Sequence, residues 1–115
     1  MDFWSDSIDD GEEIDGEYAF CVPDPENKVR FSTNLSPHMA WDDLPSDTES
    51  LVLICHDSDV PSKPDDVNVE GRTVPEDLER IDFYHWVMVD LAPDTDELEE
   101  GTFSEDVTPR GKDGP

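Results

Sequence analysis

The sequence predicts one small folded domain with a core of β-strands, and three observations carry that prediction. Two apolar runs, at residues 50–56 and 84–90, are short, continuous and rich in β-branched or aromatic residues, which is typical of strands covered on both faces. Three Trp and five Phe supply large apolar side chains for a core. A length of 115 residues fits one domain and excludes two.

The chain is strongly acidic. It has 32 Asp and Glu against 7 Lys and Arg, which gives a formal net charge of -25 at pH 7. This charge excludes nucleic acid and anionic lipid surfaces as broad electrostatic partners. Disorder is the competing interpretation of such a composition, and the aromatic residues and strand patterns favour a folded protein. We hypothesise that the surface is adapted to a salt-rich, halophilic cytoplasm, where screening weakens its self-repulsion.

The N-terminus and the two cysteines favour a cytoplasmic location. Residues 1–6 have neither the basic start nor the apolar stretch of a secretion signal, and no run approaches the roughly 20 apolar residues of a membrane helix. A disulfide framework is not expected from Cys21 and Cys55 in that compartment, and Cys55 is interpreted as a small core residue of its strand. We therefore expect a cytoplasmic protein without integral membrane association.

The segment at residues 34–45 is expected to pair with the strand that follows it. It holds a short apolar stretch between Pro37 and Pro45, and residues 45–49 are the predicted turn into the next strand. A short turn between two strands favours antiparallel pairing. Upstream, residues 21–28 are interpreted as a turn region interrupted by prolines.

Two long polar segments follow the predicted strands. Residues 62–80 form an insertion longer than ordinary connections of about 4 to 6 residues, so we expect it to be mobile or functional. Within it, residues 75–80 could form one helical turn that starts at a proline. Residues 93–106 carry seven carboxylates and are expected to form a solvated acidic loop or short helix before a linker-like end at residue 115.

Ionisable side chains stand where the two predicted strands meet loops. The segment Asp57-Ser58-Asp59-Val60-Pro61 follows the first strand, and His85 opens the second. A protonated imidazole donates two hydrogen bonds and can hold a phosphate. Asp57 would orient the ring or receive an amine, and Asp59 would fix loop amides. The alternative is that both aspartates only cap loop amides and that His85 is a satisfied core histidine.

Other chemistry finds less support in the sequence. Asp57, Asp59 and His85 could ligate a hard or borderline metal ion, but the calcium-loop pattern fails because Pro61 occupies its fifth position and no Gly its sixth. His56 and Cys55 are neighbours that point to opposite faces of a strand, so they cannot form a nucleophile pair. No P-loop, nucleophile elbow or paired-cysteine zinc pattern occurs. We expect no enzymatic activity, no catalytic residue and no cofactor.

Three motifs occur in a fixed order along the chain. They are Asn34-Leu35-Ser36-Pro37-His38 leading to Ala40-Trp41-Asp42-Asp43, then Asp57-x-Asp59-x-Pro61 after an apolar strand, then His85-Trp86-Val87. Together they resemble the phosphatidylethanolamine-binding protein family, in its bacterial and archaeal Raf kinase inhibitor-like branch. The resemblance implies a mainly β fold, an antiparallel β-sandwich with a few short helices. It also implies a small anion pocket lined by Asp57 and His85, with Asp59 and Pro61 shaping the loop.

The resemblance also implies a function. It favours non-catalytic binding of a small phosphorylated or carboxylated ligand, such as a lipid head group. One alternative is a regulator that acts on a protein target, a kinase or a protease, and a lesser one is a metal-dependent hydrolase. Family members continue into a glycine-rich segment and a His-Arg-Tyr motif, of which residues 111–115 echo only the beginning. We therefore interpret residues 1–115 as a single partial domain, truncated at its C-terminus.

Overall fold

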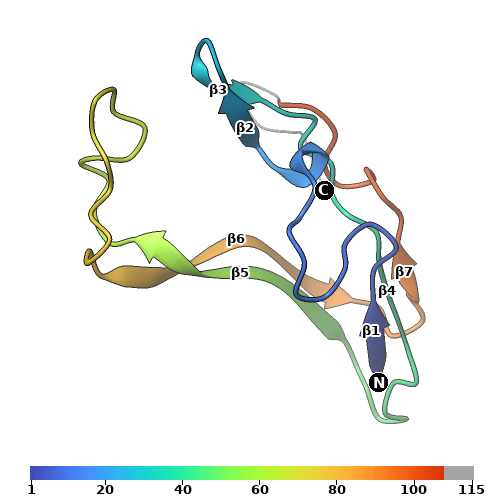
Figure 1. Ribbon diagram of the computed structural model, residues 1–115. Helices are drawn as coiled ribbons and strands as arrows, with labels where there is room; N and C mark the ends of the chain where they lie inside the picture. The colour runs from blue at the N-terminus through green and yellow to red at the C-terminus, as the bar shows by residue number, and fades with distance from the viewer. Residues whose placement is uncertain (108–115) are drawn as a thin grey trace. The chain divides into compact units, whose positions relative to one another are not determined.

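The structure is a computed structural model that describes residues 1–107, and it is mainly β (Figure 1). All strand pairs are antiparallel, which confirms the predicted fold class at that level. The chain divides into two compact units, residues 1–48 with 93–107 (unit 1) and residues 49–92 (unit 2). The helix η1 (Gly16–Tyr18) is a single 3-10 turn in unit 1. Within the described residues, no helix has the length and hydropathy needed to cross a bilayer.

Unit 1 contains a three-stranded sheet with β4 (Met39–Asp42) in the middle. Its neighbours are β1 (Asp2–Trp4) and the short β7 (Glu97–Leu98). The turn predicted at residues 45–49 is present, because the Thr48 amide donates to the Pro45 carbonyl over 3.0 Å. The predicted pairing of this segment with the next strand is wrong, since β1 and β7 already occupy both edges of β4.

The buried apolar residues of unit 1, among those the structure describes, come from β4 and β7. Ala40, Trp41 and Leu98 are its buried apolar residues, and the Trp41 indole Nε1–H donates to the Thr95 carbonyl over 2.8 Å. The segment at 93–106 is loop and turn, as its charge predicted, except for the two residues of β7. One leucine among the acids suffices to place a two-residue strand against the core.

A second feature of unit 1 is the hairpin of β2 (Cys21–Asp24) and β3 (Lys28–Phe31). The sequence indicated the turn but not these two strands. The Asp24 carboxylate accepts the Glu26 and Asn27 amides over 2.9 and 2.7 Å, which fixes the turn between them. A local hydrogen-bonding aspartate thus sets the hairpin where the apolar pattern is weak.

Unit 2 is one long hairpin of β5 (Leu51–Pro61) and β6 (Arg80–Leu91), drawn as a two-stranded ribbon in Figure 1. Both predicted strands are confirmed, and both are longer than their apolar runs. The loop between them contains hydrogen-bonded turns. At residues 75–80 the structure has a single hydrogen-bonded turn in place of the predicted helical turn. In it the Leu78 amide donates to the Pro75 carbonyl over 3.2 Å.

The hairpin is not covered on both faces, contrary to the prediction. Four apolar side chains on it are between 52% and 58% exposed, namely Val52, Ile54, Val87 and Val89. Cys55 is exposed as well, so its interpretation as a core residue is wrong. An apolar run specifies a strand that is suited to burial. The layer that buries it must come from another segment, because a two-stranded hairpin cannot cover its own faces.

Candidate functional site

Asp57 and His85 lie on opposite strands of the hairpin and their side chains meet. The Asp57 Oδ2 and His85 Nε2 atoms are 3.4 Å apart, although the residues are 28 positions apart in the sequence. The two side chains are 43% and 52% exposed, so a ligand can reach both. This exposure contradicts the alternative in which His85 is a core histidine. The pair that the sequence singled out is thus brought together within one unit.

A β-bulge positions the Asp57 side chain. Asp57 faces Phe83 and Val60 faces Ile81, so β5 has two residues where β6 has only Asp82. Such an extra residue bends a strand and redirects the neighbouring side chains, and it is common beside binding sites. The sequence placed the segment 57–61 after the end of the strand. The structure places it inside β5, because the ladder resumes at Val60 and Pro61.

The Asp57 carboxylate contacts both the bulge and the ring. Its Oδ1 accepts the Asp59 amide over 2.8 Å, and its Oδ2 faces His85. The Asp59 amide, and after it the hydrogen bond with His85, lower the pKa of Asp57 below its ordinary value. Asp57 is therefore ionised at neutral pH. It also performs the amide-fixing role that the sequence assigned to Asp59.

Asp59 and Pro61 contact Arg80 rather than the ring. The Arg80 Nε atom lies 3.7 Å from Asp59 Oδ1, and Pro61 pairs with Arg80 in the ladder. Asp59, Asp57 and His85 therefore do not converge as a metal-binding trio. Within residues 1–107, no group of three or more His, Cys, Asp or Glu side chains is arranged to hold a metal ion.

Arg80 is the residue of this region that the sequence analysis did not single out. It is a third exposed at its side chain and lies on β6, across from the end of the Asp57–Pro61 segment. The signal that could have found it is scarcity. In a chain with only 7 Lys and Arg, a cation that pairs with the Asp57–Pro61 segment stands out.

The imidazole of His85 also contacts an aromatic ring. Its centroid is 4.9 Å from that of Phe83, in an edge-on arrangement. Phe83 and His85 are two positions apart on β6 and so share a face, the face on which Phe83 is opposite Asp57. Phe83 and Asp57 together restrict the orientation of the imidazole.

A second His–Asp pair lies on the other face of the hairpin. His56 Nε2 is 2.9 Å from Asp82 Oδ1, and the His56 ring stacks on Tyr84 with centroids 5.0 Å apart. Tyr84 and Asp82 alternate with Phe83 along β6, so they face away from the Asp57–His85 pair. These contacts are consistent with a structural role for His56, and the residue is not part of the candidate site.

The first of the three motifs, at residues 34–38, has a structural role in unit 1. The buried Ser36 hydroxyl accepts the amides of Phe103 and Ser104 over 3.1 and 3.3 Å. Asn34 Nδ2 donates to the Ser104 hydroxyl over 2.9 Å, and His38 Nδ1 accepts the Asp6 amide over 3.0 Å. This motif fastens distant segments of its unit to one another.

Known proteins of one family are similar to this chain. The family described as "Phosphatidylethanolamine-binding protein" matches residues 4–114. Curated relatives include the UPF0098 protein YbhB of Escherichia coli, at 30% identity over 88% of this chain and 50% of the relative. The UPF0098 protein of Methanothermobacter thermautotrophicus is 36% identical over 58% of this chain and 32% of the relative. The UPF0098 protein of Aquifex aeolicus is 32% identical over 87% of this chain and 42% of the relative. The chain spans half or less of the length of these relatives.

Proposed function

This chain belongs to the phosphatidylethanolamine-binding protein family, and we propose that its Asp57–His85 pair binds a small phosphorylated ligand without converting it. The bacterial and archaeal relatives agree with the Raf kinase inhibitor-like branch. The single observation that carries the proposal is the 3.4 Å approach of a carboxylate and an imidazole on an exposed face of the hairpin.

The positive charge for a phosphate comes from the hairpin itself. When His85 is protonated, both ring nitrogens donate, one toward Asp57 and the other toward a phosphate oxygen. Arg80 is on the same strand, but like Asp82 and Tyr84 it alternates with Phe83 and it pairs with Asp59, so the donors of this site are those of His85. Because the chain carries a formal charge of -25, an anion gains no long-range attraction, and these local donors must supply the affinity.

The Asp57 carboxylate favours a ligand that also carries a positive group. Its lowered pKa keeps it charged at neutral pH, and it would repel a bare phosphate dianion placed on His85. A head group such as phosphorylethanolamine avoids this conflict, since its phosphate contacts the imidazole and its ammonium contacts Asp57 Oδ2. A zwitterion therefore fits this site better than inorganic phosphate does.

The absence of a nearby nucleophile supports a binding role. An imidazole and a carboxylate can move protons, but covalent hydrolysis also needs a nucleophile within hydrogen-bond reach of the base. Among the residues that the structure describes, no hydroxyl or thiol is hydrogen-bonded to His85. Its described neighbours are Asp57 and the Phe83 ring.

Titration with phosphorylethanolamine tests the proposal. The imidazole signals of the three histidines are followed by NMR near pH 6, where a histidine is partly protonated. We expect a saturable shift of His85 while His56 and His38 stay in place. Asp57→Asn should weaken the binding of phosphorylethanolamine by about fivefold, because one charged contact is lost. The same substitution should not weaken the binding of inorganic phosphate.

Asp82→Asn is the matched control. It neutralises the carboxylate of the other His–Asp pair on the opposite face, and it should leave the affinity for phosphorylethanolamine unchanged. The proposal fails if His85 does not respond, or if both variants weaken binding equally.

A further inference from the structure

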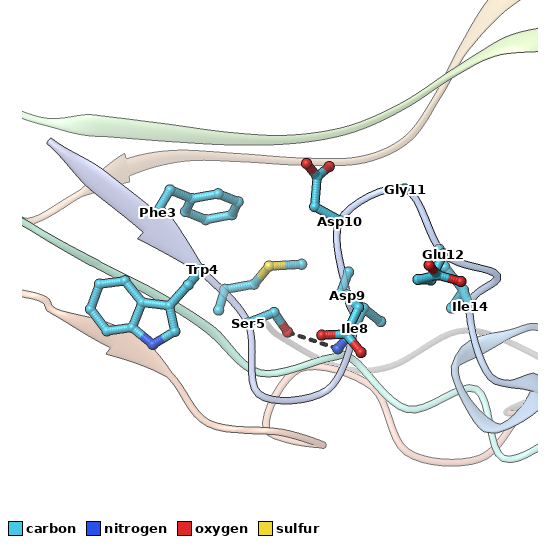
Figure 2. A pocket seen from close by; sticks show the side chains of 10 residues that line it. Phe3, Trp4, Ser5, Ile8, Asp9, Asp10, Gly11, Glu12 and Ile14 are labelled. Carbon is cyan, nitrogen blue, oxygen red and sulfur yellow. Dashed lines mark hydrogen bonds between the residues drawn. The ribbon is translucent and has the colours of Figure 1, made fainter.

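A separate pocket lies in unit 1, beside β1 (Figure 2). It encloses about 560 Å³, which is within the range of cavities that take small organic molecules. Phe3 and Trp4 of β1 form one side, Met39 of β4 contributes to the wall, and the loop at residues 8–14 forms the other side. The residues of this pocket have no part in the Asp57–His85 site.

Local hydrogen bonds fix the loop that closes the pocket. The Ser5 hydroxyl accepts the amides of Ser7 and Ile8 over 3.1 and 3.2 Å, the second of which is drawn in Figure 2. Further along, the Glu12 amide donates to the Asp9 carbonyl over 3.3 Å, and Gly11 adopts a φ of 78° that this turn requires. The loop is therefore held at its start and at the turn around Gly11, and its acidic side chains line the pocket.

The apolar side of the pocket is exposed to solvent. Phe3, Trp4 and Ile14 are among the exposed large apolar residues of the chain, and all three line this pocket. Leaving such side chains in water costs free energy, which an apolar ligand body would recover by covering them. The pocket therefore favours a ligand with an apolar or aromatic part.

The acidic side of the pocket gives the sign of the ligand's charge. Asp9, Asp10 and Glu12 line it, and none of the described residues that line it is basic. Figure 2 shows the Asp10 carboxylate projecting from the tip of the loop beside Gly11. Within residues 1–107 these three carboxylates form no ion pair with a basic side chain. Phe3 and Met39 share one face of the β1–β4 pair, and the Phe3 ring there is an aromatic surface that attracts a cation.

We propose that this pocket binds a small organic cation that has an apolar or aromatic body. The apolar body covers Phe3, Ile14 and Met39, and the positive group lies between the Phe3 ring and the loop carboxylates. The formal charge of -25 raises the local concentration of cations around the chain, so long-range attraction and local contacts act in the same direction here. This site does not depend on the phosphate-binding proposal.

Binding of benzyltrimethylammonium tests the inference on the full chain. The three Trp indole N–H signals serve as reporters in NMR. Trp4 lines the pocket, Trp41 reports through its bond to Thr95 that unit 1 is folded, and Trp86 lies in unit 2 as a reference. We expect a saturable shift of Trp4 at millimolar probe, no shift of Trp86, and weaker binding as KCl rises because salt screens the carboxylates.

Two carboxylate substitutions distinguish the pocket from general attraction. Asp10→Asn removes a lining charge, and Asp47→Asn removes an exposed charge of the same unit outside the pocket. We expect Asp10→Asn to weaken binding of the probe by about two- to fivefold, as for an exposed charge contact. We expect Asp47→Asn to leave the affinity for the probe unchanged. Phe3→Leu keeps an apolar side chain but removes the aromatic face, and it should weaken binding of the probe by about threefold.

Neutral and anionic probes complete the test. Benzyl alcohol should bind more weakly than the cation, and benzenesulfonate more weakly still. The inference is overturned if benzyl alcohol binds as tightly as the cation, if Asp10→Asn and Asp47→Asn act equally, if Trp4 and Trp86 shift in parallel, or if no saturable binding occurs while Trp41 reports a folded unit.

Discussion

Asp57 makes two contacts that hold different parts of the β5–β6 hairpin together. One carboxylate oxygen fixes the bulge through the Asp59 amide, and the other faces the ring of His85 on the opposite strand. The same side chain thus shapes the backbone and forms half of the candidate site. A substitution of Asp57 changes both at once, which is why the amide analogue Asn, of nearly the same shape, is the informative replacement.

Acidification should loosen this region through Asp57. Its folded-state pKa is lowered, so its contribution to stability is present above the ordinary aspartate pKa of about 3.9 and is lost as pH falls through the lower folded value. We expect the ¹³C titration of the Asp57 carboxyl group to have a lower midpoint in the folded chain than in urea. His85→Ala should raise that midpoint only in part, because the Asp59 amide remains. Equal midpoints in the folded and unfolded chain would contradict this.

The β5–β6 hairpin shows how an element can form without the burial that its sequence suits. Its strands pair over the predicted runs, and the cross-strand pair of Ile54 and Val87 is on an exposed face. Pairing satisfies backbone hydrogen bonds along the ladder, whereas covering the face requires a further layer. The strands are therefore a local property of the sequence, and their burial is not.

The segment at residues 34–38 holds unit 1 together through Ser36. Its hydroxyl accepts two amides, and its own amide donates to the Ser104 carbonyl over 2.9 Å. The Ser36 carbonyl in turn accepts the Gly101 amide over 2.8 Å. These bonds join segments more than sixty residues apart in the chain, so residues 34–38 stabilise the tertiary structure of unit 1.

Removing the Ser36 hydroxyl should therefore destabilise unit 1. Ser36→Ala leaves the Phe103 and Ser104 amides without that acceptor, at an expected cost of about 1–3 kcal/mol in the free energy of unfolding. Urea denaturation followed by circular dichroism measures it. The exposed Ser46 serves as the control, and Ser46→Ala should change stability by less than about 0.5 kcal/mol. Equal effects of the two substitutions would refute the role of Ser36.

At the scale of the whole molecule, charge is the dominant property. With 32 acidic and 7 basic side chains, the folded chain repels itself. The screening length falls from about 10 Å at 0.1 M salt to about 3 Å at 1 M, so added salt removes most of this repulsion. The unfolded chain is more expanded, so its charges repel one another less. Screening by salt therefore stabilises the folded form more than the unfolded one.

The melting temperature should therefore rise with KCl. For a chain of about this size, each 1 kcal/mol of relieved repulsion raises Tm by about 4–8 °C, and we expect at least that rise between 0.1 and about 1 M. Calorimetry measures the change. A variant with several exposed carboxylates replaced by their amides should show a shallower dependence, which separates screening from general salt effects. A Tm that falls steadily with KCl would reject the salt-adapted surface.

The sequence predicted some parts of this structure well and missed others for physical reasons. The strands around Ile54 and Val87 follow from apolar runs, and the pairing of Asp57 with His85 was implied by the family resemblance. The β2–β3 hairpin and β7 were missed because their apolar content is too low to stand out. The pairing of Arg80 with Asp59 was missed because it depends on the register of β6.

By itself the sequence determined the strand-forming runs, the acidic surface and the residue types of the candidate site, because these depend on side-chain chemistry and spacing along the chain. Tertiary structure alone decided that β4 pairs with β1 and β7, that a bulge aims Asp57 at His85, and that Phe3 lies beside an acidic loop. Those outcomes depend on which distant segments compete for the same backbone hydrogen bonds and apolar surfaces, and no local pattern encodes that competition.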